Sequence, residues 1–237
     1  MIAKKYILVI KYNWHEKFFN QFRKQLSGKW FIIKNEKLLN YKYLKKINPN
    51  YIFFPHWSKK VDQSIVNNFQ CICFHETDLP YGRGGTPIQN LILKNHKKTK
   101  ISAIRMINEI DAGPIYLKRS LLLSGSAKEI YERAFKIYLK MIKKIVENKI
   151  TPKEQVGKVI NFYRRIPEQS RITSEIETLE KLYNHIRMLD AEGYPNAFLE
   201  FNKLKFEFIN AKKNGNVLTT EVKIKNIKKS NTVKNNR

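Results

Sequence analysis

Two side chains, His75 and Asp111, have the chemistry of a catalytic pair: His75 ends one segment that reads as a β-strand, and Asp111 follows another. The two segments are Cys71–His75 and Ile101–Met106, both rich in apolar and β-branched residues. A histidine can accept or donate a proton near neutral pH, and a carboxylate can orient its ring and tune its charge. Ligands of an open parallel sheet bind at the carboxyl ends of its strands. The pair therefore predicts a pocket for proton transfer at that edge.

The elements around this pair alternate between short apolar strands and amphipathic helices. Such alternation is typical of crossover units that build a mainly parallel sheet. We therefore predict a Rossmann-like α/β fold with helices on both faces of the sheet. The predicted strands are Tyr6–Ile10, Trp30–Ile33, Tyr51–Phe54, Cys71–His75 and Ile101–Met106, and the predicted helices are His15–Leu26, Leu38–Ile47, Lys59–Asn68, Thr86–Leu93 and Ser126–Asn148.

The pattern changes after Pro152, and we divide the chain into a catalytic domain, residues 1–165, and a C-terminal part, residues 166–237. The second part is predicted to hold a linker helix, Thr173–Leu189, and a small β-rich extension. A β-rich piece of about fifty residues is too small for a large independent core. Its strands are predicted at Ala197–Phe201, Leu204–Ile209 and Val217–Ile224, with a basic tail from Lys223 to Arg237.

The chain carries a formal net charge of +26, a balance that nucleic-acid binders share. The excess is spread along the sequence, and the basic tail lacks the interleaved aromatic side chains of a base-stacking platform. We therefore ascribe the charge to general composition and do not expect nucleic acid as the partner. A positive surface would still attract an anionic substrate.

No apolar run approaches the roughly eighteen residues of a membrane helix. The N-terminus enters a strand without the apolar core of a secretory leader, so we expect a cytoplasmic protein with no membrane partner. The two cysteines, Cys71 and Cys73, share one face of a predicted strand, which suits neither a disulfide nor a zinc site. We predict two buried, reduced thiols and no metal.

The stretch from Cys71 to Gln89 reads CICFHETDLPYGRGGTPIQ, and a second motif, IDAGPI, covers residues 110–115. Together they resemble the N10-formyltetrahydrofolate-dependent formyltransferases, in which a strand ending in Asn-x-His precedes a Leu-Pro loop, an Arg-Gly segment and Pro-Ile-Gln at the start of a helix. His75 and Asp111 are thirty-six positions apart, much as in that family. The resemblance covers roughly residues 1–200 and implies formyl transfer to an amine through a tetrahedral intermediate.

The resemblance also implies roles for the catalytic residues. His75 assists the tetrahedral intermediate, while Asp111 orients it and relays protons. Cys73 stands where the family usually has its Asn, and a thiol donates a much weaker hydrogen bond than an amide. A backbone N–H in the turn after His75 could replace that donor. Nucleophilic catalysis by Cys73 would need a lowered pKa, for which the sequence gives no cause beyond His75.

The expected cosubstrate is N10-formyltetrahydrofolate, and the resemblance implies that it is held by Pro55, His56, Trp57, Leu79, Pro80, Ile107, Glu109, Ile110 and Asp111. Acceptor contacts are expected from Thr77, Tyr81, Arg83, Gly84, Gly85, Arg187, Asp190 and Tyr194. Two alternatives stay open. Trp57 could simply pack a loop, and the Arg83-Gly84-Gly85 segment could be either a phosphate-binding nest or a flexible loop that opens the next helix.

Two subfamilies compete for the identity of the acceptor. Methionyl-tRNA formyltransferases resemble the catalytic domain but carry a sizeable β-barrel, for which the residues after Asn196 are too few. Sugar N-formyltransferases, including those of the pseudaminic acid pathway, look more similar in length. We therefore predict a nucleotide-linked amino sugar as the acceptor. Methionyl-tRNA formylation is the first alternative, and a non-catalytic folate- or RNA-binding relative is the second. The oligomeric state, a homodimer included, is left open.

Overall fold

The computed structural model describes residues 3–227, and its main element is a six-stranded sheet with the strand order β2-β1-β3-β4-β6-β7. The first four run parallel: β2 (Lys29–Ile33), β1 (Lys5–Val9), β3 (Tyr51–Phe54) and β4 (Cys71–His75). Two strands run antiparallel to their neighbours, namely β6 (Lys98–Arg105) beside β4 and β7 (Ile115–Leu122) beside β6. The predicted α/β class with a mainly parallel sheet is confirmed.

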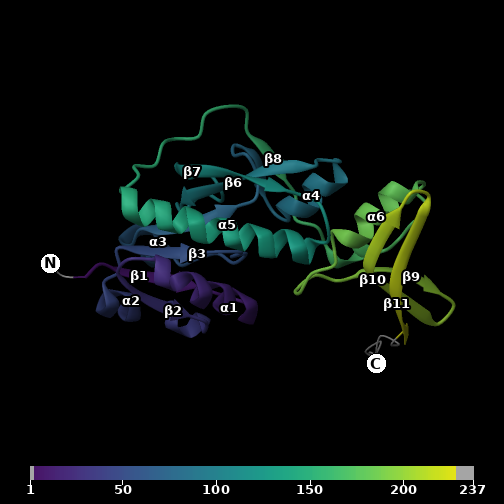
Figure 1. Cartoon of the computed structure of the whole chain (residues 1–237), viewed down its shortest axis with the longest axis horizontal. Helices are drawn as coiled ribbons and strands as arrows, with labels where there is room; N and C mark the ends of the chain where they lie inside the picture. Colours follow the sequence, from purple (N-terminus) through teal and green to yellow (C-terminus); the bar gives the residue numbers. More distant parts are fainter. Residues whose placement is uncertain (1–2, 228–237) are drawn as a thin grey trace, which may run out of the picture. The chain divides into compact units, whose positions relative to one another are not determined.

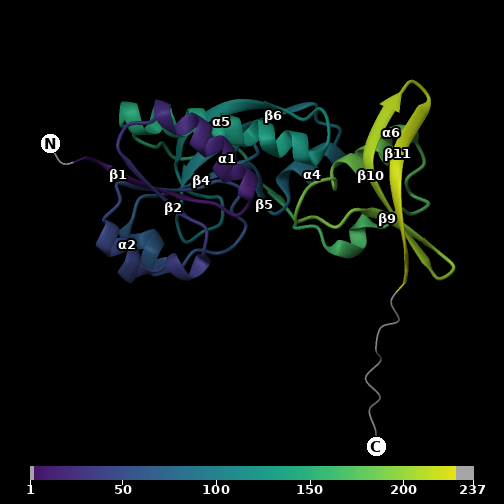
Figure 2. The ribbon, with the colours of Figure 1, turned by 60° about the horizontal axis from the view of Figure 1, so that its bottom comes forward.

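Helices cover both faces of the sheet (Figures 1 and 2). Because side chains alternate along a strand, each face has its own apolar set. On one face, α2 (Tyr41–Ile47) and α3 (Gln63–Asn68) pack on alternate residues of β1, β3 and β4 in one buried cluster. On the other face, α1 (Asn13–Phe22) and α5 (Ala127–Asn148) pack through aromatic contacts such as Phe19 with Trp30 and Tyr138 with Phe74.

Three strands were not predicted from the sequence. One is β7, which returns antiparallel after the 106–114 loop, because that loop is too short for a crossover helix. The other two, β5 (Tyr81–Gly84) and β8 (Ile160–Phe162), pair parallel in a separate two-stranded sheet. The sheet of β5 and β8 lies next to α4 (Pro87–Leu93). Residues 76–80 connect β4 to β5, the first strand of this small sheet.

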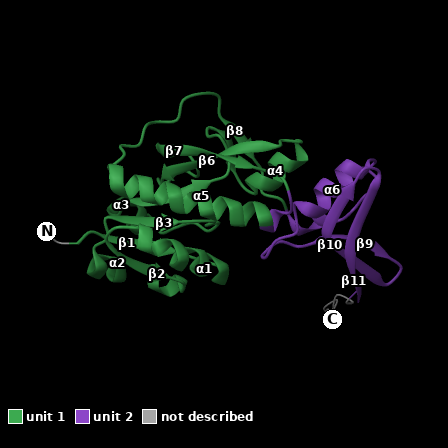
Figure 3. Ribbon diagram, viewed as in Figure 1, with its two compact units in different colours: residues 1–124, 129–165 green, residues 125–128, 166–237 purple. Residues whose placement is uncertain are grey.

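The chain divides into two compact units (Figure 3). Unit 1 comprises residues 1–124 and 129–165, and unit 2 comprises residues 125–128 and 166–237. Unit 2 contains α6 (Leu179–Arg187) and an antiparallel sheet of β9 (Ala197–Phe201), β10 (Leu204–Asn214) and β11 (Val217–Asn226). The helix predicted from Thr173 begins only at Leu179, because the Thr178 hydroxyl accepts the N–H of Lys181 and caps the helix there.

Short 3-10 helices occur at Arg23–Gln25, Glu36–Leu38 and Pro167–Ser170. Among residues 3–227, no helix combines the length and the apolar character needed to cross a membrane. The part of the predicted basic tail from residue 228 onward lies outside the described residues.

Candidate active site

His75 is the last residue of β4, and its ring is held almost out of solvent. The ring Nε2 lies 2.7 Å from the carbonyl oxygen of Gly82, so this nitrogen carries a hydrogen and donates it. Ser102 is the partner of His75 in the β4–β6 register, and its hydroxyl donates to the carbonyl oxygen of Thr77 over 2.8 Å. The hydrogen bonds from His75 and Ser102 therefore hold the end of β4 and the turn that follows it.

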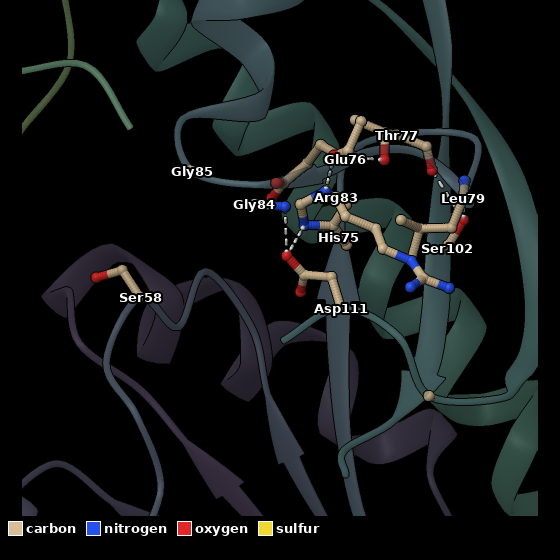
Figure 4. Close-up of polar contacts among 12 residues, drawn as sticks. Ser58, His75, Glu76, Thr77, Leu79, Arg83, Gly84, Gly85, Ser102 and Asp111 are labelled. Carbon is tan, nitrogen blue, oxygen red and sulfur yellow. Dashed lines mark hydrogen bonds and ion pairs between the residues drawn. The ribbon is translucent and has the colours of Figure 1, made fainter. Parts of the chain in front are cut away.

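Asp111 reaches His75 from the loop between β6 and β7 (Figure 4). Its Oδ2 atom lies 3.5 Å from His75 Nδ1 and accepts the backbone N–H of Gly84 over 2.9 Å. The backbone of Asp111 has a φ of 54°, in the left-handed region that costs a non-glycine residue about 1–2 kcal/mol. The loop thus brings the two residues of the predicted pair together.

The N–H that binds Asp111 comes from β5, and its position requires a glycine. Gly84 has a φ of 105°, and a Cβ built on it would lie 2.3 Å from the carbonyl oxygen of Phe162 on β8. The next N–H, that of Gly85, donates to the same Phe162 oxygen over 3.1 Å. Both glycine N–H groups are used within unit 1, so the phosphate-nest interpretation of this segment is not supported by the geometry.

Cys73 lies two residues before His75, where the family resemblance implies an Asn. Its side chain packs against the apolar cluster beneath α2 and α3. Burial, followed by the nearby Asp111 carboxylate, raises the pKa of the Cys73 thiol well above its usual range. Burial likewise raises the pKa of Cys71 to about 12. Both thiols therefore stay protonated at neutral pH, as expected for free, non-nucleophilic cysteines.

A buried polar network lies behind His75, and sequence reasoning missed most of its members. His56 Nδ1 is 2.9 Å from His15 Nε2, and His56 Nε2 is 3.7 Å from Glu76 Oε1. The Tyr138 hydroxyl donates to the same Glu76 oxygen. Burial lowers the pKa of His56 and of His15, the latter to about 3, and burial raises the pKa of Glu76. A buried histidine close to a buried carboxyl cannot be recognised from sequence spacing alone.

This network changes the interpretation of the predicted folate contacts. The His56 side chain is turned inward to His15 and Glu76, which leaves only its backbone for a ligand. The predicted contacts after β4 are also covered, since Leu79 and Pro80 are buried. By contrast, three predicted contacts beside Asp111, namely Ile107, Glu109 and Ile110, are exposed. Trp57 packs on Phe54 and is partly buried, which agrees with its loop-packing alternative.

The predicted acceptor contacts near His75 are mostly occupied by the protein itself. Thr77 is fully buried, and its hydroxyl donates to the Gly82 carbonyl oxygen over 3.4 Å, so this side chain supports the loop and does not face solvent. The Tyr81 hydroxyl lies 3.3 Å from His96 Nε2. The Arg83 guanidinium binds Glu109 on the Asp111 loop and Gln155, a residue that sequence reasoning missed.

The remaining three predicted acceptor contacts belong to unit 2. Arg187 is buried, and its guanidinium donates to Asn184 Oδ1 and to the Gly125 carbonyl oxygen, each over 2.8 Å. The Asp190 carboxylate accepts the N–H of Asn210 over 2.9 Å, and the N–H of Tyr194 donates to Ala191. The Asp190–Asn210 hydrogen bond joins the loop after α6 to β10. Acceptor binding by the three residues stays a prediction.

The described residues contain no cluster of three or more histidine, cysteine or acidic side chains that could bind a metal ion. A ring nitrogen held by a carbonyl and a second one facing a carboxylate suit a group that stabilises a charged intermediate and moves a proton.

One solved structure matches nearly the whole chain. A methionyl-tRNA formyltransferase structure from Clostridium thermocellum is 43% identical with a TM-score of 0.90, covering 94% of this chain and 99% of that one. Residues 167–225 match the family described as the C-terminal domain of methionyl-tRNA formyltransferase. The segment judged too short for such an enzyme thus has a counterpart in one.

Curated relatives and other solved structures match at lower identity. A methionyl-tRNA formyltransferase from Buchnera aphidicola is 29% identical over 78% of this chain and 67% of its own length. One from Campylobacter jejuni is 27% identical over 73% of this chain, which spans only 56% of that relative. A 4-N formyltransferase from Francisella tularensis has a TM-score of 0.62 at 16% identity, covering 83% of this chain and 92% of that one, which shows a shared fold alone.

Proposed function

This chain belongs to the folate-dependent formyltransferase family, and from that premise we propose that it transfers the formyl group of N10-formyltetrahydrofolate to the amino group of methionyl-tRNA. The observation that carries the proposal is the match with the Clostridium thermocellum methionyl-tRNA formyltransferase, which extends over both units. The amino-sugar acceptor expected from the sequence has less support, because the structures described as sugar N-formyltransferases are only 15% and 17% identical to this chain.

Two properties of the chain favour tRNA as the acceptor. Unit 2 contains the 167–225 segment that matches the C-terminal domain of methionyl-tRNA formyltransferases. The net charge of +26 fits a polyanionic substrate better than the general composition to which the sequence pattern alone assigns it. On this interpretation the basic side chains contact phosphates and speed association, while the specific chemistry occurs at His75 and Asp111.

The mechanism follows from what these two side chains present. The acceptor amine attacks the formyl carbon, and the carbonyl oxygen becomes an oxyanion in the tetrahedral intermediate. His75 donates a hydrogen bond or a proton to this centre, and Asp111 accepts from the ring and stabilises its positive charge. The amine nitrogen loses a proton, the folate N10 gains one, and the bond between the formyl carbon and N10 breaks. Asp111 relays the proton between the two nitrogens.

The donor would lie against the loops that carry this pair. Ile107 and Ile110 present exposed apolar side chains beside Asp111, which suits an aromatic pterin ring. The Pro55–Trp57 loop would contribute backbone groups, because the His56 ring is turned into the protein. HypX from Aquifex aeolicus, whose structure contains tetrahydrofolic acid, has the same fold at 14% identity with a TM-score of 0.72. That likeness supports the fold alone.

The test is a comparison of acceptors with one donor. The full chain is incubated with N10-formyltetrahydrofolate labelled in the formyl group and with methionyl-tRNA, or with UDP- or dTDP-linked 4-amino sugars. We expect label to pass to methionyl-tRNA, with a rate that falls steeply as salt is raised. Methionyl-tRNA with a blocked amino group is the matched control and should receive no label.

Transfer to an amino sugar with none to methionyl-tRNA would reject the tRNA acceptor and favour the sugar alternative. Salt-dependent RNA binding without transfer to any acceptor would favour the non-catalytic alternative. A His75→Asn variant assayed in parallel separates enzymatic transfer from spontaneous formylation.

A further inference from the structure

The segment after α5, residues 150–165, contacts each loop of the candidate active site, and we call it the strap. The strap runs back from the end of α5 to β8 (Figure 1). Lys153 forms an isolated β-bridge with Ile115, with N···O distances of 2.7 and 2.9 Å. Farther along, β8 pairs with β5, and Arg164 donates to the carbonyl oxygen of Ser58 over 3.2 Å. Ser58, which is labelled in Figure 4, comes directly after Pro55–Trp57 in the sequence.

Gln155 is the residue of the strap that reaches the catalytic aspartate. Its Nε2 donates to the backbone carbonyl oxygens of Asp111 over 2.7 Å and of Gly113 over 2.9 Å. Its Oε1 accepts from Nε and Nη2 of Arg83 over 3.1 and 2.9 Å. The amide is therefore saturated, with both donors on the Asp111 loop and its acceptor on β5.

These contacts compensate for the unusual backbone of the Asp111 loop. Asp111 is in the left-handed region, and a Cβ built on Gly113 would lie 1.8 Å from the Arg105 carbonyl oxygen. The tight turn leaves the carbonyl oxygens of Asp111 and Gly113 pointing to one spot, which the Gln155 amide occupies. With the backbone held there, the Asp111 carboxylate meets both the Gly84 N–H and the His75 ring.

We propose that Gln155 is a positioning residue for catalysis, which holds the Asp111 loop so that the carboxylate of Asp111 faces His75. The inference rests on the proposed function only in taking His75 and Asp111 as the reacting pair. Gln155 touches neither side chain of the pair and acts through the Asp111 backbone. A displacement of the carboxylate by about 1 Å is enough to lower a rate by up to roughly a hundredfold.

The sharpest test is Gln155→Glu. The glutamate has the same shape and still accepts from Arg83, but it sets a carboxylate oxygen against the two carbonyl oxygens that the amide donated to. We expect kcat for methionyl-tRNA formylation to fall roughly ten- to a hundredfold, while KM for both substrates changes less than about threefold. Gln63→Glu makes the same chemical change at an exposed position of α3 and should leave both constants unchanged.

A second readout needs no substrate. The Gly84 N–H bonds to the Asp111 carboxylate, so its NMR resonance and its hydrogen-exchange rate report the position of that carboxylate. In Gln155→Glu the Gly84 resonance should shift and its exchange should become faster, whereas Gln63→Glu should match the wild type. Gln155→Ala, which removes the amide without adding charge, should change both readouts in the same direction and serves if Gln155→Glu does not fold.

Unchanged kcat in a folded Gln155 variant would overturn the proposal, and so would an unchanged Gly84 signal beside a lowered kcat. A loss of melting temperature with both readouts intact would show a purely structural role and would also overturn it. If the wild-type chain formylates no acceptor, the proposed function fails, and the Gly84 amide alone then decides whether Gln155 holds Asp111.

Discussion

His75 has one ring nitrogen on a backbone carbonyl and the other facing a carboxylate, and this limits how it handles protons. The hydrogen on Nε2 is held by Gly82, so the nitrogen that responds to Asp111 is Nδ1. A doubly protonated ring satisfies both oxygens with donated hydrogens. Asp111 should therefore matter through its charge as well as through its shape.

We expect His75→Asn to lower the rate of formyl transfer on the order of a hundredfold or more, because general acid–base and oxyanion help are usually of that size. Asp111→Asn keeps the shape but removes the charge, so kcat should fall while the fold is retained. The double variant should be little worse than the worse single variant, since residues that act as a unit are not additive. Steady-state kinetics with circular dichroism checks this, and a folded Asp111→Asn protein with normal kcat would contradict it.

Cys73 should have no chemical role, because its pKa is raised by burial and by the neighbouring Asp111. Cys73→Ala is expected to keep most of the activity and to lose some stability, since the thiol packs in the apolar cluster. Activity and thermal unfolding are measured together. A loss of kcat as large as that of His75→Asn in a folded protein would show that the sulfur takes part in the reaction.

Sequence motifs predicted that His75 and Asp111 meet at one edge of the sheet, and the structure brings them together there, while their catalytic role stays a prediction. They did not locate Glu76 or Gln155, whose importance comes from burial and from contacts across the chain. Thr77 was expected to bind the acceptor and is instead fully buried. A motif indicates which segments form a site, but it does not show whether each side chain faces the site or the protein interior.

At the scale of elements, the site depends on the pairing of β5 with β8, and Gly84 permits that pairing. We expect Gly84→Ala to destabilise the protein by roughly 2 kcal/mol or more, because the added Cβ would meet the Phe162 carbonyl and the φ is unsuited to alanine. Gly215→Ala is the matched control. Its φ is 56°, but nothing lies within 4 Å of the added Cβ, so it should cost only about 1–2 kcal/mol.

Denaturant unfolding of the two glycine variants gives the comparison. Equal losses of unfolding free energy would mean that the close approach of β5 to β8 is not needed.

The long apolar strands and helices of unit 1 were predictable, because their hydrophobic periodicity is set by burial on both faces of the sheet. The predicted Tyr51–Phe54 and Cys71–His75 strands have the observed bounds. The missed β5 contains Gly-Arg-Gly, and β8 has only three residues, so neither carries the β-branched alternation on which prediction relies. Both form because each supplies the other's hydrogen bonds.

At the scale of the whole molecule, the largest error concerned the C-terminal residues. The strands of unit 2 extend to Asn214 and Asn226, beyond the predicted ends at Ile209 and Ile224, because hydrogen bonding in a hairpin continues through polar and lysine-rich sequence. The predicted β-structure was therefore smaller than the one that the chain forms. The acceptor was inferred separately, from the small number of residues after Asn196.

The two buried histidines should make the global free energy of unfolding depend on pH. Burial lowers the pKa of His15 to about 3 and lowers that of His56, so the unfolded chain binds their protons more readily than the folded one. Their contribution to stability is complete above pH 6.5 and is lost as the pH falls below it, by about 1.4 kcal/mol per pH unit for each fully buried histidine. Glu76, whose pKa is raised by burial, opposes part of this loss.

We therefore expect the free energy of unfolding to be lower at pH 5.5 than at pH 7.5, by about 1 kcal/mol or more. His15→Phe fills the same stacked position on Phe135 without a titrating group, so its free energy of unfolding should depend less on pH. The control is His96→Gln, at a partly exposed position, which should keep the pH dependence of the wild type. The test is denaturant unfolding of the wild type and both variants at the two pH values. If the free energy of unfolding of His15→Phe falls between pH 7.5 and pH 5.5 by as much as that of the wild type, the assignment is contradicted.

The strap has a consequence for how the protein is made. The ribosome releases His75 and Asp111 well before residues 150–165, which supply Gln155 and β8. A nascent chain that has reached the end of α5 holds all six strands of the main sheet, yet its catalytic aspartate lacks the contacts that fix it. If Gln155 holds the Asp111 loop as proposed, the growing polypeptide acquires its architecture first and its reactivity only after about 1–3 further seconds of synthesis, at roughly 5–20 residues per second.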